Sequence, residues 1–222
     1  MVGRSYHHGD LRAALLDAAE SLVRERGAEG WSLREVSARV GVSPSAAYHH
    51  FESRDALVRA LSWRVLAGLG EHLSRVAGRA RGQREDPRAR LIAVGRGYVR
   101  WTLRDPSVAS LVFGAHRGEP ENPVSPHPHD VLVEELDRLV DAGGLPASSR
   151  PGAEFVLWPA MHGLAALLGD GLMCLDGPRD VDSQAERLIR AVLAGLAAEP
   201  PRTPDRPRVR SAHTERLAKR KS

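Results

Sequence analysis

Apolar residues recur along most of this 222-residue chain at spacings of three and four, which places them on one face of an α-helix. Alternating runs of β-branched residues, which are typical of half-buried strands, are absent from the sequence. The pattern therefore predicts an all-α protein with about nine helices. The segments with helical spacing are 11–26, 33–40, 44–51, 53–73, 91–103, 107–113, 131–140, 154–168 and 184–197.

Short-range signals mark the limits of the second and third of these segments. Ser32 and Glu35 have the spacing of a capping box, in which each side chain bonds the backbone N–H of the other residue at the start of a helix. Gly41 stands where helices commonly end in a left-handed residue. Ser43 suits the N-cap of a new helix, and Pro44 suits its first position. These signals predict two short helices joined by a tight turn, which is the pattern of a helix-turn-helix.

The side chains of the second short helix fall into two groups. Ala47 and Phe51 share an apolar face that, together with Leu33 and Val36, is expected to pack on the first helix. The small and polar side chains of the other faces are free to enter a DNA groove, and they are Ser45, Ala46, Tyr48, His49 and His50. An ordinary turn between two core helices is the alternative interpretation of the same spacing.

Four segments of this region resemble a known family closely. They are residues 6–12 (YHHGDLR), 32–36 (SLREV), 41–43 (GVS) and 47–57 (AYHHFESRDAL), and they are similar to the N-terminal domain of the TetR family. The resemblance implies a one-component transcription regulator, usually a repressor, with a three-helix DNA-binding domain and an all-α effector and dimerisation domain. It also implies a homodimer bound to a palindromic operator in double-stranded DNA.

The resemblance assigns individual DNA-binding residues. Arg34 corresponds to a position that reaches bases or phosphate from the first short helix. The assigned reading edge of the recognition helix is Ser43, Pro44, Ser45 and Ala46, and the assigned phosphate-side residues are Tyr48, His49, His50 and Arg54. Ala46 departs from the family pattern, because many members have Thr there; its methyl group can touch a thymine methyl but cannot bond phosphate. Arg4, His7 and His8 are candidates for an arm along a groove.

A weaker resemblance covers the second half of the chain. Residues 98–101, 105–106, 111–113 and especially 158–165 (WPAMHGLA) look like the C-terminal domain of a TetR subgroup named for its Trp…His-Gly signature. The family dimerises through its last two helices, which correspond here to 154–168 and 184–197. Small and apolar residues suited to that contact are Ala160, Gly163, Ala165, Ala166, Leu188, Val192 and Leu196.

The resemblance further implies a cavity for an unidentified small-molecule effector. The candidate lining residues are Trp63, Tyr98, Trp101, Phe113, Phe155, Trp158, Met161 and His162, with Met173 as a further candidate. Aromatic residues and methionines at helical spacing also fill ordinary cores, and His162 has the alternative of a satisfied core or interface histidine. Residues 119–128, with four prolines, form either a mobile lid or a surface loop.

Positive charge is concentrated near the C-terminal end of the sequence. Residues 199–222 carry eight basic and three acidic residues, whereas the other 198 residues carry 24 basic and 25 acidic ones. A local surface, rather than bulk charge, must therefore bind DNA. We expect a flexible arm (1–9), a DNA-binding domain (10–55), a ligand-binding and dimerisation domain (56–198) and a basic, disordered tail (199–222). The tail either adds non-specific DNA affinity or acts only as a solubilising extension.

Other classes of chemistry find little support in the sequence. No motif of a serine hydrolase, zinc protease or di-iron bundle occurs, so we expect neither an enzyme nor a cofactor. Cys174, the single cysteine, is expected to be buried, and His127 and His129 are weak metal candidates in a flexible loop. Without a signal peptide or a membrane-length apolar run, we expect a cytoplasmic protein with no membrane partner. The alternative class is an all-α small-molecule-binding or enzymatic protein whose N-terminal domain no longer reads DNA.

Overall fold

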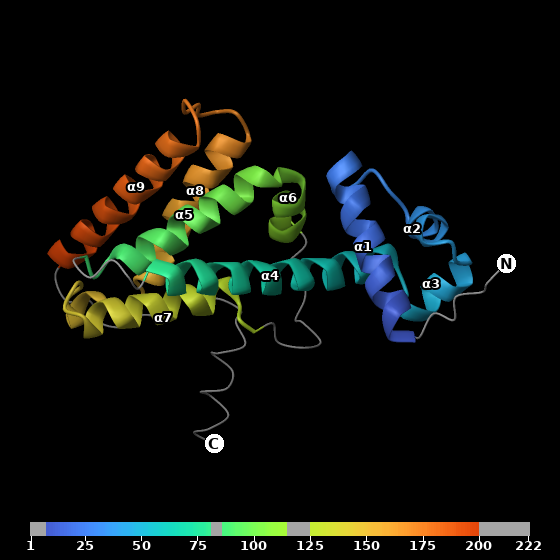
Figure 1. The fold of residues 1–222 in the computed structure, drawn as a ribbon, viewed down its shortest axis with the longest axis horizontal. Coiled ribbons are helices and arrows are strands. Elements are labelled where there is room, and N and C mark those ends of the chain that lie inside the picture. The colour runs from blue at the N-terminus through green and yellow to red at the C-terminus, as the bar shows by residue number, and fades with distance from the viewer. Residues whose placement is uncertain (1–7, 81–85, 115–124, 200–222) are drawn as a thin grey trace, which may run out of the picture. The chain divides into compact units, whose positions relative to one another are not determined.

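The computed structural model describes residues 8–80, 86–114 and 125–199, and these ranges are built from helices joined by short connections (Figure 1). No strand occurs in them, and the predicted all-α fold is confirmed. The helices are α1 (His8–Arg26), α2 (Leu33–Val40), α3 (Pro44–His50), α4 (Arg54–Arg79), α5 (Ala89–Arg104), α6 (Pro106–Gly114), α7 (Pro128–Asp141), the short 3₁₀ helix η2 (Ala147–Ser149), α8 (Glu154–Gly169) and α9 (Pro178–Ala198). Most of the predicted arm and tail lie outside the described ranges.

The chain divides into two compact units. The first comprises residues 1–65 and 105–120, and the second comprises residues 66–104 and 121–222. α6 lies within the range 56–198 that is expected to form one domain, but it belongs to the first unit because it packs on α1. A bond at the beginning of α6 supports that contact, since Arg24 Nε donates to Asp105 Oδ2 at 2.6 Å.

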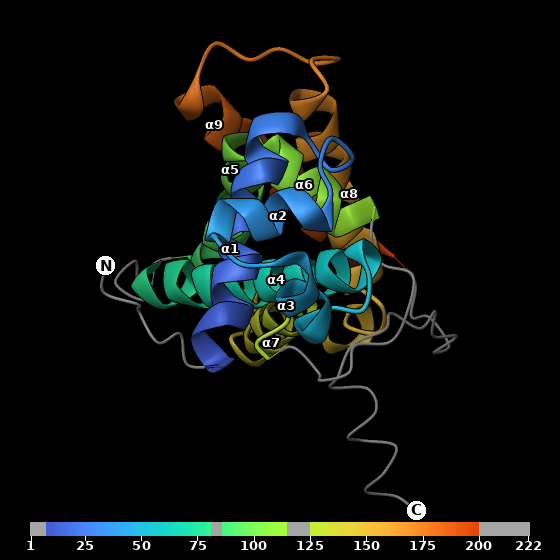
Figure 2. The same cartoon turned by 90° about the vertical axis from the view of Figure 1, so that its right-hand side faces the viewer.

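The first unit is organised around α1, against which α2, α3 and α6 pack (Figure 2). Apolar side chains from four helices meet in its core, because each helix carries them on one face. Leu15 of α1, Val36 of α2, Ala47 of α3 and Leu57 of α4 are all fully buried. The predicted inward faces of the two short helices are thereby confirmed.

The second unit is organised around α5, which contacts α7, α8 and α9 (Figure 1). Gly95 allows α5 and α9 to approach closely, because a Cβ at this position would overlap the end of the Ile189 side chain. Ion pairs flank the same contact: Arg96 bonds Glu186, and Arg100 bonds Asp182. Close packing and peripheral charge pairs together specify how α5 lies on α9.

Three sequence-based expectations for the second unit differ from the structure. α9 begins at Pro178 instead of residue 184, because its first turns are polar and lack the apolar spacing that marked the rest. α7 begins at Pro128 with His127 as its N-cap, so His127 and His129 belong to a buried helix start and not to a flexible loop. The expected burial of Cys174 is wrong, since this side chain is exposed between α8 and α9.

A membrane-spanning helix would need a long stretch with few charges, and none of the described helices has one.

Candidate nucleic-acid interface

The turn between α2 and α3 is formed as its local signals predicted. Ser32 and Glu35 form the capping box: the Ser32 backbone N–H donates to the Glu35 carboxylate at 2.8 Å, and the Glu35 N–H donates to Ser32 Oγ at 3.3 Å. Gly41 is left-handed, with φ 79° and ψ 29°, and ends α2. The Val42 N–H then donates to Ser37 O at 3.0 Å, which completes the bond pattern of a Schellman motif.

The recognition helix α3 starts at once after this turn. Ser43 caps it, because its Oγ accepts from the Ala46 N–H at 3.2 Å. Phe51 is 3% exposed and anchors the other end of the helix in the core of the first unit. A short helix of this kind derives its stability from its caps and its buried face, because seven residues are too few to be helical alone.

The opposite face of α3 presents polar and small groups to solvent. Tyr48 is 48% exposed, although it is a large aromatic residue. The predicted reading-edge and phosphate-side residues divide as follows: Ser43, Pro44, Ser45, Tyr48 and His49 are exposed, and Ala46 and His50 are half-buried. The structure thus brings all seven together on one short helix and its cap.

The two arginines of α2 differ in whether their charge is already paired. Arg39 is exposed, but both its terminal nitrogens donate to Glu25, at 2.6 and 2.7 Å. Arg34 is also exposed, and it makes no ion pair or hydrogen bond with any residue that the structure describes. Arg34 therefore offers a guanidinium that can donate to a phosphate or a base without breaking an internal bond.

Arg54 at the start of α4 is bonded inside the first unit. Its Nε donates to Trp31 O at 3.1 Å, and its Nη2 donates to Ala28 O. The guanidinium also lies over the Trp31 ring, 4.4 Å from the centroid. These contacts attach the start of α4 to the segment that leads from α1 into α2. A phosphate contact by Arg54 stays a prediction, and its observed contacts are structural ones.

Several of the predicted effector-lining residues come together in the second unit. The Tyr98 hydroxyl lies 2.9 Å from His162 Nδ1. Burial raises the pKa of Tyr98, although a hydrogen bond from Trp158 opposes this, and burial lowers the pKa of His162. Both groups are therefore neutral near pH 7. Because an indole can only donate, Trp158 supplies a proton to the phenol oxygen, and the phenol proton is available for His162.

Two histidines that the sequence did not place with these residues lie beside them in the structure. His129 lies with its ring centroid 5.6 Å from that of Trp158 and 6.2 Å from that of Phe155, and His127 lies 6.1 Å from Trp158. Both histidines were considered only as metal ligands, but no group of three metal-binding side chains occurs among the residues that the structure describes. The signal in the sequence was the His-Pro-His order, which suits an N-cap and a first turn.

The other candidates for the effector cavity differ in their surroundings. Trp63 belongs to the first unit, and Met173 is exposed beyond the end of α8. Met161 is buried, and its Sδ lies 3.0 Å from where a Cβ on Gly95 would stand, so it fills the contact with α5. Trp101 is half-buried on α5, and the side chain of Phe113 lies outside the described part of the structure.

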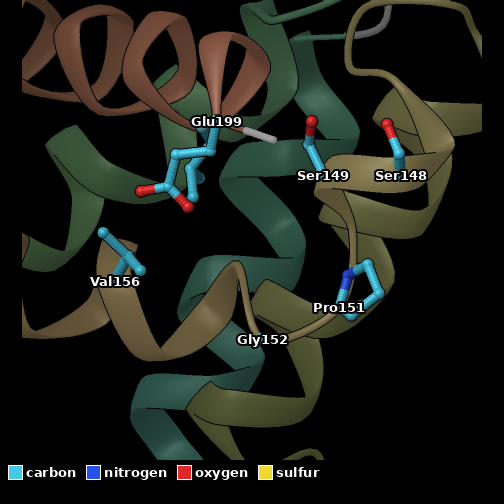
Figure 3. A pocket seen from close by; sticks show the side chains of 7 residues that line it. Ser148, Ser149, Pro151, Gly152, Val156 and Glu199 are labelled. Atoms are coloured by element: carbon cyan, nitrogen blue, oxygen red, sulfur yellow. The ribbon is translucent and has the colours of Figure 1, made fainter. Parts of the chain in front are cut away.

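A shallow depression on the second unit involves none of these residues. Figure 3 shows Val156 of α8 and Glu199, just after α9, facing the segment that carries Ser148, Ser149 and Pro151. Its lining offers neither an aromatic surface nor a cluster of charges.

Comparison with known proteins agrees with this two-part organisation. A family model for bacterial regulatory proteins of the tetR family matches residues 15–61, which run from α1 into α4. A second model, for a C-terminal domain like that of the tetracycline repressor, matches residues 91–192, which run from α5 into α9. These models do not test the resemblance to the Trp…His-Gly subgroup.

Individual relatives support the same assignment. The transcriptional regulator BetI of Brucella anthropi is 34% identical over 83 residues, which are 37% of this chain and 41% of BetI. The transcriptional repressor Rv3405c of Mycobacterium tuberculosis is 39% identical over 67 residues, which are 30% of this chain and 34% of the repressor. The chain thus matches well under half the length of these curated relatives.

A solved structure from Rhodococcus sp. RHA1, of a protein with unknown function, extends the likeness to the whole fold. It is 27% identical, covers 88% of this chain and 100% of its own, and has a TM-score of 0.69. Together with the two family models, this likeness shows that the chain belongs to the tetR family of bacterial regulatory proteins.

Proposed function

We propose that this protein is a sequence-specific DNA-binding transcription regulator of the cytoplasm. It acts as a repressor that leaves its operator when a small molecule binds the second unit. One observation carries the proposal: a capped recognition helix presents an exposed polar face beside Arg34, whose guanidinium is unpaired within the described residues. The names of the relatives, a regulator and a repressor, agree with this function.

Within this proposal, affinity and sequence preference come from different side chains. Tyr48, His49 and His50 bond phosphates from α3, because hydroxyl and imidazole groups set the register of the helix without reading bases. Ser45 and Ala46 are small, so the helix can approach base edges closely. Arg34 adds a charge-assisted bond from α2.

The test compares the two arginines of α2 on DNA selected by the protein from a genomic library. Arg34→Ala is expected to weaken binding 10-fold or more, on the order of 1–3 kcal/mol for one good contact to a base, or to lower the salt dependence if the contact is to phosphate. Arg39→Ala is the matched control, because Glu25 already holds that guanidinium. Equal effects of the two variants, or no selected DNA at all, would contradict the assignment of the DNA-binding face.

We also propose that two copies pair through α8 and α9. Val156 and Leu167 of α8 are 38% and 42% exposed, and Pro159 and Gly163 lie between them on the same face. Exposed apolar side chains at this spacing favour a partner helix. Of the residues predicted for this contact, Ala165 and Leu196 are buried inside the unit and are therefore unavailable.

Gly163 offers a clean test of pairing. A Cβ there meets nothing within 4 Å in the single chain, so the first atom of a leucine side chain has room at Gly163. If α8 packs against a second copy, the larger side chain separates the copies while the fold persists. Sedimentation analysis and circular dichroism measure the two effects, and a variant that stays dimeric would show that pairing occurs elsewhere.

A further inference from the structure

His129, the second residue of α7, is a buried polar group. Its side chain is 8% exposed, and neither ring nitrogen makes a hydrogen bond with any residue that the structure describes. Leaving such a group buried and unpaired costs free energy comparable to the loss of a hydrogen bond. An uncompensated penalty of this size, in a unit whose other buried polar groups are mostly bonded, indicates a group that is kept to bind something else.

Two aromatic rings lie close to this imidazole. The His129 ring is tilted by 33° to Trp158 and by 45° to Phe155, and both neighbours come from α8. The His127 Nδ1 accepts the His129 backbone N–H at 3.2 Å and so holds the start of α7 in place. We call His127, His129, Phe155 and Trp158 the His129 cluster. Its ring surfaces suit a planar aromatic molecule.

The indole of Trp158 is held in place by Tyr98 of α5. Its indole bonds the Tyr98 oxygen, and Tyr98 in turn bonds His162 Nδ1 at 2.9 Å. The orientation of the Trp158 ring toward His129 is therefore fixed from α5. A ring held in this way loses little freedom when a ligand packs on it, which favours binding.

The charges near His129 determine what its nitrogens can do. Asp130 Oδ1 lies 3.6 Å from His129 Nδ1, which favours the tautomer with its proton on Nδ1 and leaves a lone pair on Nε2. Glu135, the buried acid of α7, is already bonded by Arg90 at 2.6 Å. The cluster thus offers His129 Nε2 as an acceptor near the carboxylate of Asp130. This arrangement favours a neutral hydrogen-bond donor and disfavours an anion.

We infer that the His129 cluster binds a neutral aromatic molecule carrying a hydroxyl group. The ring packs against Trp158 and Phe155, and the hydroxyl donates to His129 Nε2. This inference rests on the proposed role of the second unit in effector binding, and it adds the chemical class of the effector. It also explains the unpaired imidazole, since the ligand supplies the missing bond.

The test uses the full chain and three probes of similar size. Phenol has both the ring and the donor, toluene has the ring alone, and benzoate has the ring with a negative charge. Calorimetric titration is expected to show phenol binding about 2- to 10-fold more tightly than toluene, because phenol donates a hydrogen bond that toluene lacks. Benzoate is expected to bind more weakly than phenol. Equal binding of phenol and toluene, a preference for benzoate, or no phenol binding would overturn the inference.

A substitution of the imidazole separates hydrogen bonding from ring packing. His129→Phe keeps a flat ring but removes both nitrogens, so phenol and toluene should bind it equally. His72 lies in the part of α4 that belongs to the second unit, and His72→Phe is the control, which should retain the preference for phenol. Circular dichroism verifies that both variants fold. A preference for phenol that survives in His129→Phe would show that the hydroxyl is read by another group.

The same experiment distinguishes this inference from the proposed function. Release of selected DNA is measured with each probe alongside direct binding. Phenol that binds but leaves DNA affinity unchanged would contradict effector-controlled release and leave the ligand assignment standing. A regulator released by other molecules, with no phenol binding, would contradict the ligand assignment alone.

Discussion

Arg54 provides a sharp test of whether a residue near the recognition helix contacts DNA or holds the helix in place. Its guanidinium bonds the carbonyl oxygens of Ala28 and Trp31 and stacks on the Trp31 ring. The side chain is 30% exposed, so these contacts are partly shielded from water. We expect Arg54 to act by positioning, because it connects the start of α4 to the segment just before α2.

The size of the effect follows from these contacts. A hydrogen bond that involves a charged group contributes about 1.5–3 kcal/mol, and a cation–π contact contributes about 0.5–2 kcal/mol. The terms are not additive, and partial exposure weakens both. We therefore expect Arg54→Met to lower the free energy of unfolding by about 2–3 kcal/mol, which corresponds to roughly 4–10 °C in Tm. Arg54→Lys keeps the charge but reaches only one carbonyl, and about half of this loss is expected.

Two measurements on each variant decide between the roles. Thermal unfolding gives the loss of stability, and DNA binding across a salt series gives the number of phosphate contacts. Removal of one phosphate contact flattens the slope of log affinity against log salt by about 0.9. A positioning residue lowers the affinity and leaves that slope unchanged.

Arg59 is the matched control for lost charge on the same helix, since it makes no ion pair with the residues that the structure describes. Arg59→Met should leave Tm nearly unchanged. If Arg54→Met unfolds at the temperature of the parent protein and its salt slope falls by about one, the positioning role is refuted and Arg54 contacts phosphate.

Three further predictions concern backbone and protonation. Gly41→Ala should lower the free energy of unfolding by about 1–2 kcal/mol in urea denaturation, purely through its positive φ, because a Cβ there meets nothing within 4 Å; an unchanged midpoint would contradict the strain. Gly70→Ala should destabilise the protein by about 3 kcal/mol or more, because its Cβ would overlap the carbonyl oxygen of Pro126 and lie 2.8 Å from the carbonyl carbon. A Tm within about one degree of that of the parent protein would show that the backbone at Pro126 moves away at little cost. Burial lowers the pKa of His162 and His72, so their contribution to stability is complete above the ordinary imidazole pKa of about 6.5 and is lost as the pH falls through their lowered pKa values. We therefore expect Tm to fall between pH 7 and pH 5, and His162→Gln to make this fall smaller. A larger fall of Tm in the variant would contradict the argument.

The recognition helix was predictable from sequence because its signals are local. Ser32, Gly41 and Ser43 act on backbone groups within five residues of themselves, so their chemistry is the same in any fold that contains the turn. The inward placement of Ala47 and Phe51 follows in the same way from helical spacing. The predicted start of the last helix was wrong because the first turns of α9 are polar and lack apolar spacing.

The sequence alone thus determined the all-α class, the helix-turn-helix and its exposed face. Only the tertiary structure decided which long-range partners each side chain meets. Arg54 bonds residues 23 and 26 positions away, α6 packs on α1, and His129 is buried between rings of α8. Helical periodicity records which face of a helix is apolar but not which helix covers it. For that reason only the tertiary structure shows that Arg54 is bonded to the backbone and that the His129 ring makes no hydrogen bond with the described residues.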